Sequence, residues 1–144
     1  MTFLVDANII VYAAIPSRYR ESCVEVLAAI AAGRADGRVS TAVFEEVWHL
    51  ELSGRVGPIR GLAERAYRAF TPLLAVTDEI VARALRLDSR RLGANDRIHV
   101  ATALANGMDT IVSADTDFDR VRAIRRVDPL DDQAIARLLQ PVRS

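Results

Sequence analysis

Short apolar runs alternate along this chain with longer segments in which apolar residues recur at helical spacing. The short runs predict β-strands and the periodic segments predict α-helices. The predicted strands are 3–5, a brief one around Val39, 73–76, 110–113 and 125–127. The predicted helices are 9–14, 20–32, 41–53, 59–70, 78–91, 94–106 and 131–139, with a short helical turn after 115. Strands that alternate with helices indicate an α/β fold, with a mostly parallel sheet covered by helices on both faces.

The first run, Phe3-Leu4-Val5, is wholly apolar, which predicts a strand buried on both faces, as a central parallel strand is. Asp6 follows at once and would stand at the carboxyl end of that strand, where open α/β sheets bind their ligands. Asp is also a favoured N-cap, so Asp6 could instead cap the helix expected from Ile9. This stretch alone does not separate the two roles.

The composition indicates one domain over residues 1–144, because a chain of 144 residues with 51% hydrophobic content can bury a sizeable core. Apolar runs such as 9–15 are too short to span a membrane, and the N-terminus lacks the basic lead of a secretory signal. We therefore expect a cytoplasmic protein without a membrane segment. The one cysteine, Cys23, has no partner for a disulfide or a metal motif.

The net charge is zero, and all 19 basic residues are arginine. Arginine binds phosphate bidentately where lysine offers a point charge, and a mechanism that needs a lysine is excluded. The candidate phosphate contacts are Arg18, Arg20, Arg55, Arg90, Arg91 and Arg97. Because there is no net charge, any electrostatic steering of a nucleic acid would be local.

Two acids follow predicted strands. Asp6 comes directly after 3–5, and Asp115 comes after 110–113 with one residue between. The carboxyl ends of parallel strands meet at one edge of a sheet, so the two side chains would project toward the same edge. If the strands are neighbours, the carboxylates would repel each other strongly unless a cation lies between them.

The position of Glu46 around its predicted helix makes it a further candidate site residue. On the helix 41–53, Glu46 lies within about sixty degrees of the apolar stripe through Val43 and Val47, whereas Glu45 points well away from it. An acid beside an inward stripe is costly unless it has a partner. We therefore take Glu46 as a candidate site residue and Glu45 and Glu51 as solvated charges.

Asp96 shares a helical face with Val100 and Ala103, which turns it inward at the start of the helix 94–106. Asn95 and Asp96 are also both good helix caps, so capping is the alternative role. His99 follows Asp96 by three positions and could support it, although a packed helix histidine is the more ordinary interpretation. Neither His49 nor His99 has the spacing of a zinc motif.

Four inward carboxylates on one edge, Asp6, Glu46, Asp96 and Asp115, would carry about four negative charges. Mg²⁺ or Mn²⁺, which prefer oxygen ligands, would be their natural occupants. An acidic site without a nucleophile of its own suits the metal-assisted hydrolysis of a phosphodiester.

The same residues carry a family resemblance. The segments 6–8, 40–46, 96–103 and 111–118, in this order and spacing, resemble the PIN domain and, more narrowly, the VapC toxins of type II toxin–antitoxin systems. The resemblance implies a three-layer α/β/α fold with a five-stranded parallel sheet in the order 3-2-1-4-5. It also implies an endoribonuclease dependent on Mg²⁺ or Mn²⁺ that leaves 3′-hydroxyl and 5′-phosphate ends.

Carried over to this chain, the resemblance makes Asp6, Glu46, Asp96 and Asp115 an acidic quartet, with Asp6 and Asp96 as the most direct metal ligands. Asn8 and Ser113 match polar residues that support the site. Asp117 matches a frequent extra acid that binds the metal directly or through water, and Asp119 is expected at the surface.

The resemblance also implies protein partners, namely a small antitoxin that covers the active-site groove and a second copy of the chain. Trp48, Leu50 and Leu52, with the stretch 9–15, supply apolar surface for such contacts, or else belong to the core.

Three other functions remain to be weighed. The first is a PIN-fold nuclease acting in RNA processing or on DNA without an antitoxin, which a neighbouring antitoxin reading frame would exclude. The second is a phospho-receiver module, which needs a lysine that this chain lacks. The third is an inactive RNA-binding domain, against which the complete quartet argues.

Overall fold

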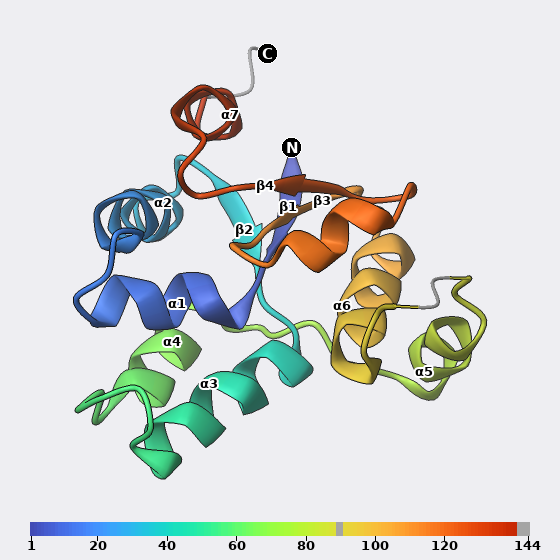
Figure 1. Ribbon diagram of the computed structural model, residues 1–144, viewed down its shortest axis with the longest axis horizontal. Helices are drawn as coiled ribbons and strands as arrows, with labels where there is room; N and C mark the ends of the chain where they lie inside the picture. Colours follow the sequence, from blue (N-terminus) through green and yellow to red (C-terminus); the bar gives the residue numbers. More distant parts are fainter. Residues whose placement is uncertain (89–90, 141–144) are drawn as a thin grey trace.

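A parallel sheet of four strands, in the order β2-β1-β3-β4, forms the centre of the computed structural model, which describes residues 1–88 and 91–140 (Figure 1). The strands are β1 (Thr2–Val5), β2 (Asp36–Arg38), β3 (Thr110–Val112) and β4 (Arg125–Val127). All three strand pairs are parallel. The first strand therefore lies inside the sheet, as its wholly apolar sequence predicts.

Helices connect the strands and cover the sheet. They are α1 (Ala7–Ala14), α2 (Arg20–Ala31), α3 (Thr41–Ser53), α4 (Leu62–Phe70), α5 (Asp78–Leu85), α6 (Ala94–Ala105) and α7 (Asp132–Leu138), with a short 3₁₀ helix, η1 (Thr116–Arg120). In Figure 1, α1 and α2 lie on one side of the sheet, and α5 and α6 lie on the other. The three-layer α/β/α arrangement follows from this placement.

Side chains along β1 point alternately to the two faces of the sheet, and each face has its own apolar cluster. Phe3 and Val5 pack in one apolar cluster with residues of α1, α2, α3, α4 and α7. Leu4 points the other way, into a second cluster that includes Val100 of α6 and Phe118 of η1. All three strand residues are fully buried, which is what a strand covered on both faces requires.

The third of the five predicted strands, 73–76, is wrong, and the sheet of the described residues has four strands. This segment makes only an isolated parallel bridge between Leu74 and Ser40, just beyond the end of β2. The backbone N–H of Leu74 donates to Val39, and that of Thr41 donates to Leu74. Pro72 has no N–H to donate, and Thr77 already caps α5, so the segment is too short for a ladder. It still occupies the edge next to β2, where the order 3-2-1-4-5 places it.

Several element boundaries also differ from the predictions; the first helix begins at Ala7 and not at Ile9, and three others differ more. The second strand ends at Arg38, and Val39, the expected centre of that strand, follows it. The helix expected at 59–70 begins at Leu62, because Gly61 before it has a left-handed backbone with a φ of 81°. The helix expected at 78–91 ends at Leu85, and residues 89–90 of that range lie outside the described residues. Within the described ranges, no helix is long and apolar enough to cross a bilayer.

Candidate active site

The carboxyl edge of the sheet carries two adjacent groups of possible ligand atoms. The inner group, as we call it, consists of Asp6, Glu46 and His99, and the outer group consists of Asp96, Asp115 and Asp117. Within each group, one ligand atom per residue lies within 4.8 Å of the others. The fold thus brings all four carboxylates of the expected quartet, and Asp117, to one edge.

Asp6 is both a helix cap and a member of the inner group. Its Oδ1 accepts a hydrogen bond from the N–H of Ala7 at 2.8 Å, at the start of α1. Its Oδ2 accepts from the hydroxyl of Ser113 at 2.6 Å and from the amide of Asn8 at 3.1 Å. The residue is only 5% exposed. Burial raises the pKa of Asp6, although His99 and the Ser113 hydrogen bond act in the opposite direction.

Ser113 joins the ends of two neighbouring strands. Its buried hydroxyl donates to Asp6, and it accepts from Asn8 at 3.1 Å and from the N–H of Asp115 at 3.0 Å. Asn8 completes the link, since its Oδ1 accepts from the N–H of Ala114 at 3.2 Å. The Ser113 hydroxyl thus makes one hydrogen bond as donor and two as acceptor, which is all that a hydroxyl can make. Together these bonds place Ser113 and Asn8 beside Asp6 and Asp115.

Glu46 lies at the site and Glu45 lies in solvent, as helical phase predicts. The Glu46 side chain, 28% exposed, has its Oε1 at 3.0 Å from Nε2 of His99. The amide of Asn95, from the first turn of α6, donates to the same oxygen. Glu46 of α3 is therefore held by two residues of α6.

His99 is fully buried, and it contacts the carboxylates on one side only. Its Nε2 faces Glu46 and lies 3.9 Å from Oδ1 of Asp6, whereas its Nδ1 has no hydrogen-bond partner among the described residues. Burial alone would lower the pKa of His99, but the hydrogen bond to Glu46 and the charges of Asp6, Glu46 and Asp96 outweigh it and raise the pKa. The sequence interpretation of a packed histidine missed these contacts; the one available signal was its position three residues after Asp96.

Asp96 is not a helix cap. The N-cap of α6 is Gly93, and Asn95 bonds to Glu46 instead. Asp96 stands in the first turn, half-buried, and its pKa is raised to about 6, first by burial and then by the charges of Asp115 and Asp6. A carboxylate whose ionisation is opposed by burial and by neighbouring carboxylates is relieved by a cation, and an oxygen-only group such as the outer one suits Mg²⁺ or Mn²⁺.

The segment after β3 presents the other two acids of the outer group. Asp115 caps η1, with its Oδ1 accepting from the N–H of Asp117 at 2.9 Å. Asp117 is 44% exposed and lies 3.4 Å from the guanidinium of Arg120. The outer group is therefore more open to solvent than the inner one.

The candidate phosphate-binding arginines differ in whether their guanidinium groups are exposed and able to contact a phosphate. The guanidinium of Arg97 donates to the carbonyls of Leu92 and Leu87 at 2.8 and 2.7 Å, so those bonds hold the segment before α6 and not a phosphate. Arg18 donates to the hydroxyl of Tyr19 and lies over its ring. The exposed candidates are Arg18, Arg20, Arg55 and Arg91. Arg90 lies outside the described residues.

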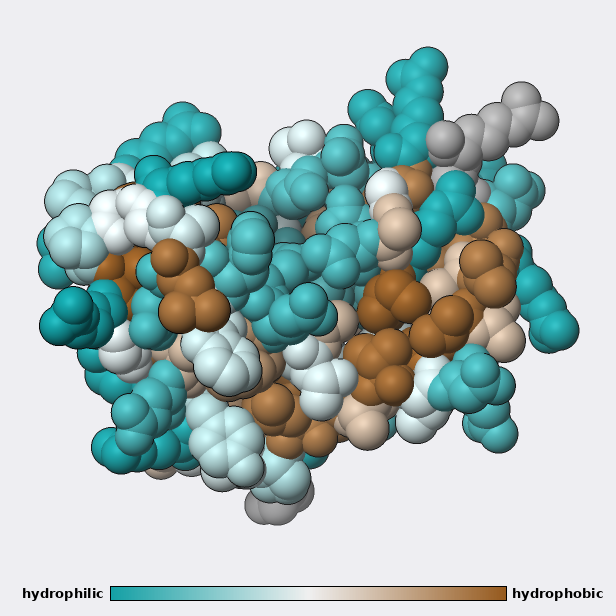
Figure 2. Space-filling model, turned by 90° about the horizontal axis from the view of Figure 1, so that it is seen from below, coloured by the Kyte–Doolittle hydropathy of each residue, from teal (hydrophilic) through white to brown (hydrophobic). Residues whose placement is uncertain are grey.

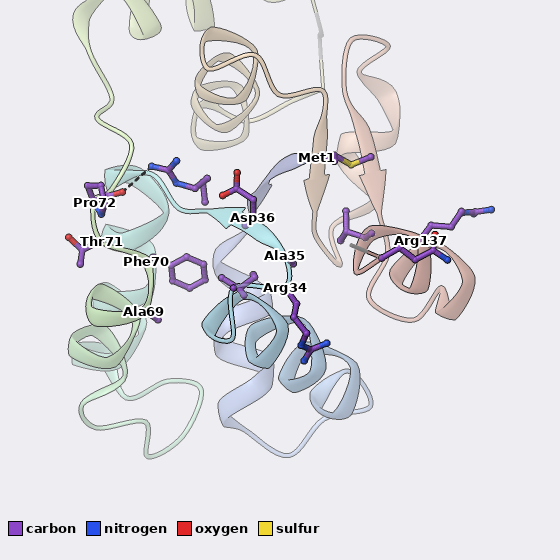
Figure 3. A pocket seen from close by; sticks show the side chains of 15 residues that line it. Met1, Arg34, Ala35, Asp36, Ala69, Phe70, Thr71, Pro72 and Arg137 are labelled. Carbon is purple, nitrogen blue, oxygen red and sulfur yellow. Dashed lines mark hydrogen bonds between the residues drawn. The ribbon is translucent and has the colours of Figure 1, made fainter. Parts of the chain in front are cut away.

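A wide groove lies at the opposite, amino end of the sheet (Figure 3). It has a volume of about 1260 Å³, and its lining includes Met1, Arg34, Asp36, Phe70 and Arg137. None of the residues of the inner or outer group lines it. The groove and the carboxylates are therefore separate features of the molecule.

Comparison with known proteins agrees with this architecture. A family model described as the PIN domain matches residues 3–124. VapBC2 from Rickettsia felis, solved bound to a DNA fragment from its promoter, superimposes with a TM-score of 0.68 at 17% identity, covering 89% of this chain and 98% of that one. Mycobacterium tuberculosis VapC20, described as a toxin that cleaves the sarcin–ricin loop, gives 0.64 at 20% identity, covering 82% and 93%. No curated protein matches the sequence significantly.

Proposed function

The chain belongs to the PIN domain family, and from that premise we propose that it is a metal-dependent endoribonuclease, the toxin of a type II toxin–antitoxin pair. The similarity of its fold to VapBC2 and to VapC20, the toxin that cleaves the sarcin–ricin loop, supports this function. We propose that it acts in the cytoplasm, with RNA as the substrate.

The observation that carries the proposal is that the inner group and the outer group lie together at the carboxyl edge of the sheet. Asp6, Glu46, Asp96 and Asp115 would hold Mg²⁺ or Mn²⁺, with Asp117 as a further ligand. Such an ion, when bound, supplies a Lewis acid for the phosphate and lowers the pKa of a coordinated water. The raised pKa values of Asp6 and Asp96 in the metal-free chain support a cation at this place.

The neighbouring residues would orient these acids. Ser113 and Asn8 hold one oxygen of Asp6, while the N–H of Ala7 holds the other. His99 and Asn95 hold Oε1 of Glu46, which fixes the direction of that carboxylate from the side of α6. Ligands held in this way lose little freedom when an ion binds. The exposed candidate arginines, Arg18, Arg20, Arg55 and Arg91, would contact the RNA backbone.

Apolar residues on α3 and α4 provide a surface for the proposed antitoxin or for a second copy of the chain. Trp48, Leu52 and Tyr67 are 50%, 74% and 48% exposed. Figure 2 shows the face that includes α3, where apolar side chains lie among polar ones, most densely in the right half of the view, on the side of α5 and α6. The stretch 9–15 contributes less than its sequence suggests, because Ile9 and Ile10 belong to the core. We propose that the chain forms a homodimer and binds a small antitoxin. Light scattering of the chain alone tests the homodimer, and light scattering with the product of a neighbouring antitoxin reading frame tests the complex.

The direct test is cleavage of total cellular RNA by the purified protein. We expect cleavage with Mg²⁺ or Mn²⁺, none with EDTA, and none by Asp6→Asn. Wild-type, Asp6→Asn and Asp36→Asn proteins should be compared at equal concentration, since Asp36 is an exposed acid at the far end of the sheet. Cleavage that survives both EDTA and Asp6→Asn would contradict the proposed mechanism.

A further inference from the structure

Arg126 on β4 makes an unusually full set of contacts for an arginine beside the site. Its Nε and Nη2 donate to the two carboxylate oxygens of Asp119 at 2.9 and 3.1 Å. Its Nη1 donates to the backbone carbonyl of Ser113 and to Oδ2 of Asp128, each at 3.0 Å. The side chain is 9% exposed. Such a planar, bidentate fork fixes the relative position of its partners in a way that a single point charge cannot.

Two partners of Arg126, Ser113 and Asp119, flank Asp115 and Asp117 of the outer group in the sequence. The segment 113–119 begins at Ser113 and ends at Asp119, and it carries Asp115 and Asp117 between them. Inside the segment, the N–H of Asp115 donates to the Ser113 hydroxyl and the N–H of Asp117 donates to Asp115. One guanidinium therefore holds both ends of a short loop whose interior is already hydrogen-bonded. No bond joins Arg126 to Asp115 or Asp117 in the part of the chain that the structure describes.

We propose that Arg126 is a positioning residue, which sets Asp115 and Asp117 in place for the metal ion by holding the 113–119 segment at both ends. The inference rests on the proposed metal-dependent function. The crowding of the outer group explains the need for such a device, since Asp96, Asp115 and Asp117 offer oxygens within 4.8 Å of one another. Without an ion, like charges at this distance push the loop away from α6, and the bonds to Arg126 oppose that displacement.

The test compares Arg126→Lys with Arg125→Lys. Both variants keep the charge and lie on the same strand, but Arg125 is exposed. Mn²⁺ binding to each protein should be measured by isothermal titration calorimetry, and RNA cleavage should be measured as a function of Mn²⁺ concentration. For Arg126→Lys we expect Mn²⁺ affinity to fall by about 10–100-fold, with the cleavage rate at saturating Mn²⁺ close to that of the wild type. Arg125→Lys should match the wild type in both.

Asp119→Asn provides a second variant, because it removes one carboxylate of the fork and leaves the contacts to Ser113 and Asp128. It should weaken Mn²⁺ binding in the same direction by a smaller factor, and it serves in place of Arg126→Lys if that variant does not fold. A lower thermal stability with unchanged Mn²⁺ affinity in both variants would show a merely structural role and overturn the inference. Wild-type protein that binds no Mn²⁺ would overturn the proposed function and this inference with it, whereas equal binding by wild type and variants overturns the inference alone.

Discussion

The two ends of the parallel sheet both carry charged residues, but those at the carboxyl end are more buried than those at the amino end. At the carboxyl end, Asp6 is 5% exposed, and Ser113 and His99 are fully buried beside it. At the amino end, Arg34 and Asp36 are exposed around an open groove of about 1260 Å³. This groove is at the end without the gathered carboxylates. Buried charge carries a large desolvation cost that exposed charge does not, so we propose the carboxyl end, and not the groove, as the place of the chemistry.

The direction of the chain explains the difference. Each parallel strand ends where the next helix begins, so the carboxyl end collects helix starts with their free N–H groups. Asp6 and Asp115 use these groups as caps of α1 and η1, and Asp96 stands in the first turn of α6. The amino end collects helix ends and turns, which offer acids no comparable support.

The largest difference in RNA cleavage rate between substitutions at the two ends should appear with Asp96→Asn and Asp36→Asn. Because Asp96 belongs to the outer group, its loss should lower the metal-dependent RNA cleavage rate by more than the roughly 10–100-fold typical of residues behind a metal ligand. Asp36, which pairs with the Thr2 hydroxyl at the amino end, should be dispensable. Cleavage rates at saturating Mn²⁺ measure both, and equal losses would remove the distinction between the ends.

Glu46→Ala and Glu45→Ala sharpen the comparison within one helix. Glu46 is held by His99 and Asn95, whereas Glu45 is exposed. Because Glu46 is a proposed metal ligand, we expect cleavage to fall by at least about 10-fold for Glu46→Ala and to stay unchanged for Glu45→Ala. If both substitutions had the same effect on the rate, the helical-phase argument would be wrong.

The stability of the metal-free protein should fall as pH rises. Asp96 has its usual pKa of 3.8 in the unfolded chain and about 6 in the folded one, so between these values the folded state binds more protons. The free energy of unfolding then decreases with pH through about 6, and the raised pKa values of Asp6 and His99 act in the same direction. Urea unfolding in EDTA measures this slope, and Asp96→Asn should flatten it. A slope that Asp96→Asn leaves unchanged would contradict the assignment to Asp96, and added Mn²⁺ should reduce the slope in the wild type.

The smallest effect is expected at the groove. Arg34→Ala changes an exposed side chain that lines it. The free energy of unfolding should change by no more than about 0.5 kcal/mol, and the rate of RNA cleavage should stay the same. A large loss of cleavage would show that the amino end takes part in the function after all.

Local patterns in the sequence were enough to predict the central strand and the placement of the acids. The apolar triplet before Asp6 and the helical phases of Glu46 and Asp96 each depend on a few neighbouring positions. The structure agrees with all of these placements, and it shows that Asp6 is a cap as well as a member of the inner group.

The contacts that hold the acids could not be predicted in this way. His99 and Glu46 are separated by 53 positions in the sequence, and helical phase says nothing about which side chain from another helix each one meets. Arg126 follows Arg125 in a strand of only three residues, so the sequence did not distinguish the buried arginine from the exposed one. The false strand at 73–76 has the same origin, since its residues favour a strand but its neighbours limit the pairing to Leu74.

The hydrogen bond between Asp6 and Ser113 joins positions that are 107 residues apart. A ribosome that translates this chain therefore makes Asp6 well before the residues that complete the site. During synthesis the growing polypeptide holds Asp6 without Ser113, Asp115 or Arg126. For the proposed ribonuclease, the site would therefore stay incomplete until Ser113, Asp115 and Arg126 have been synthesised and folded against β1.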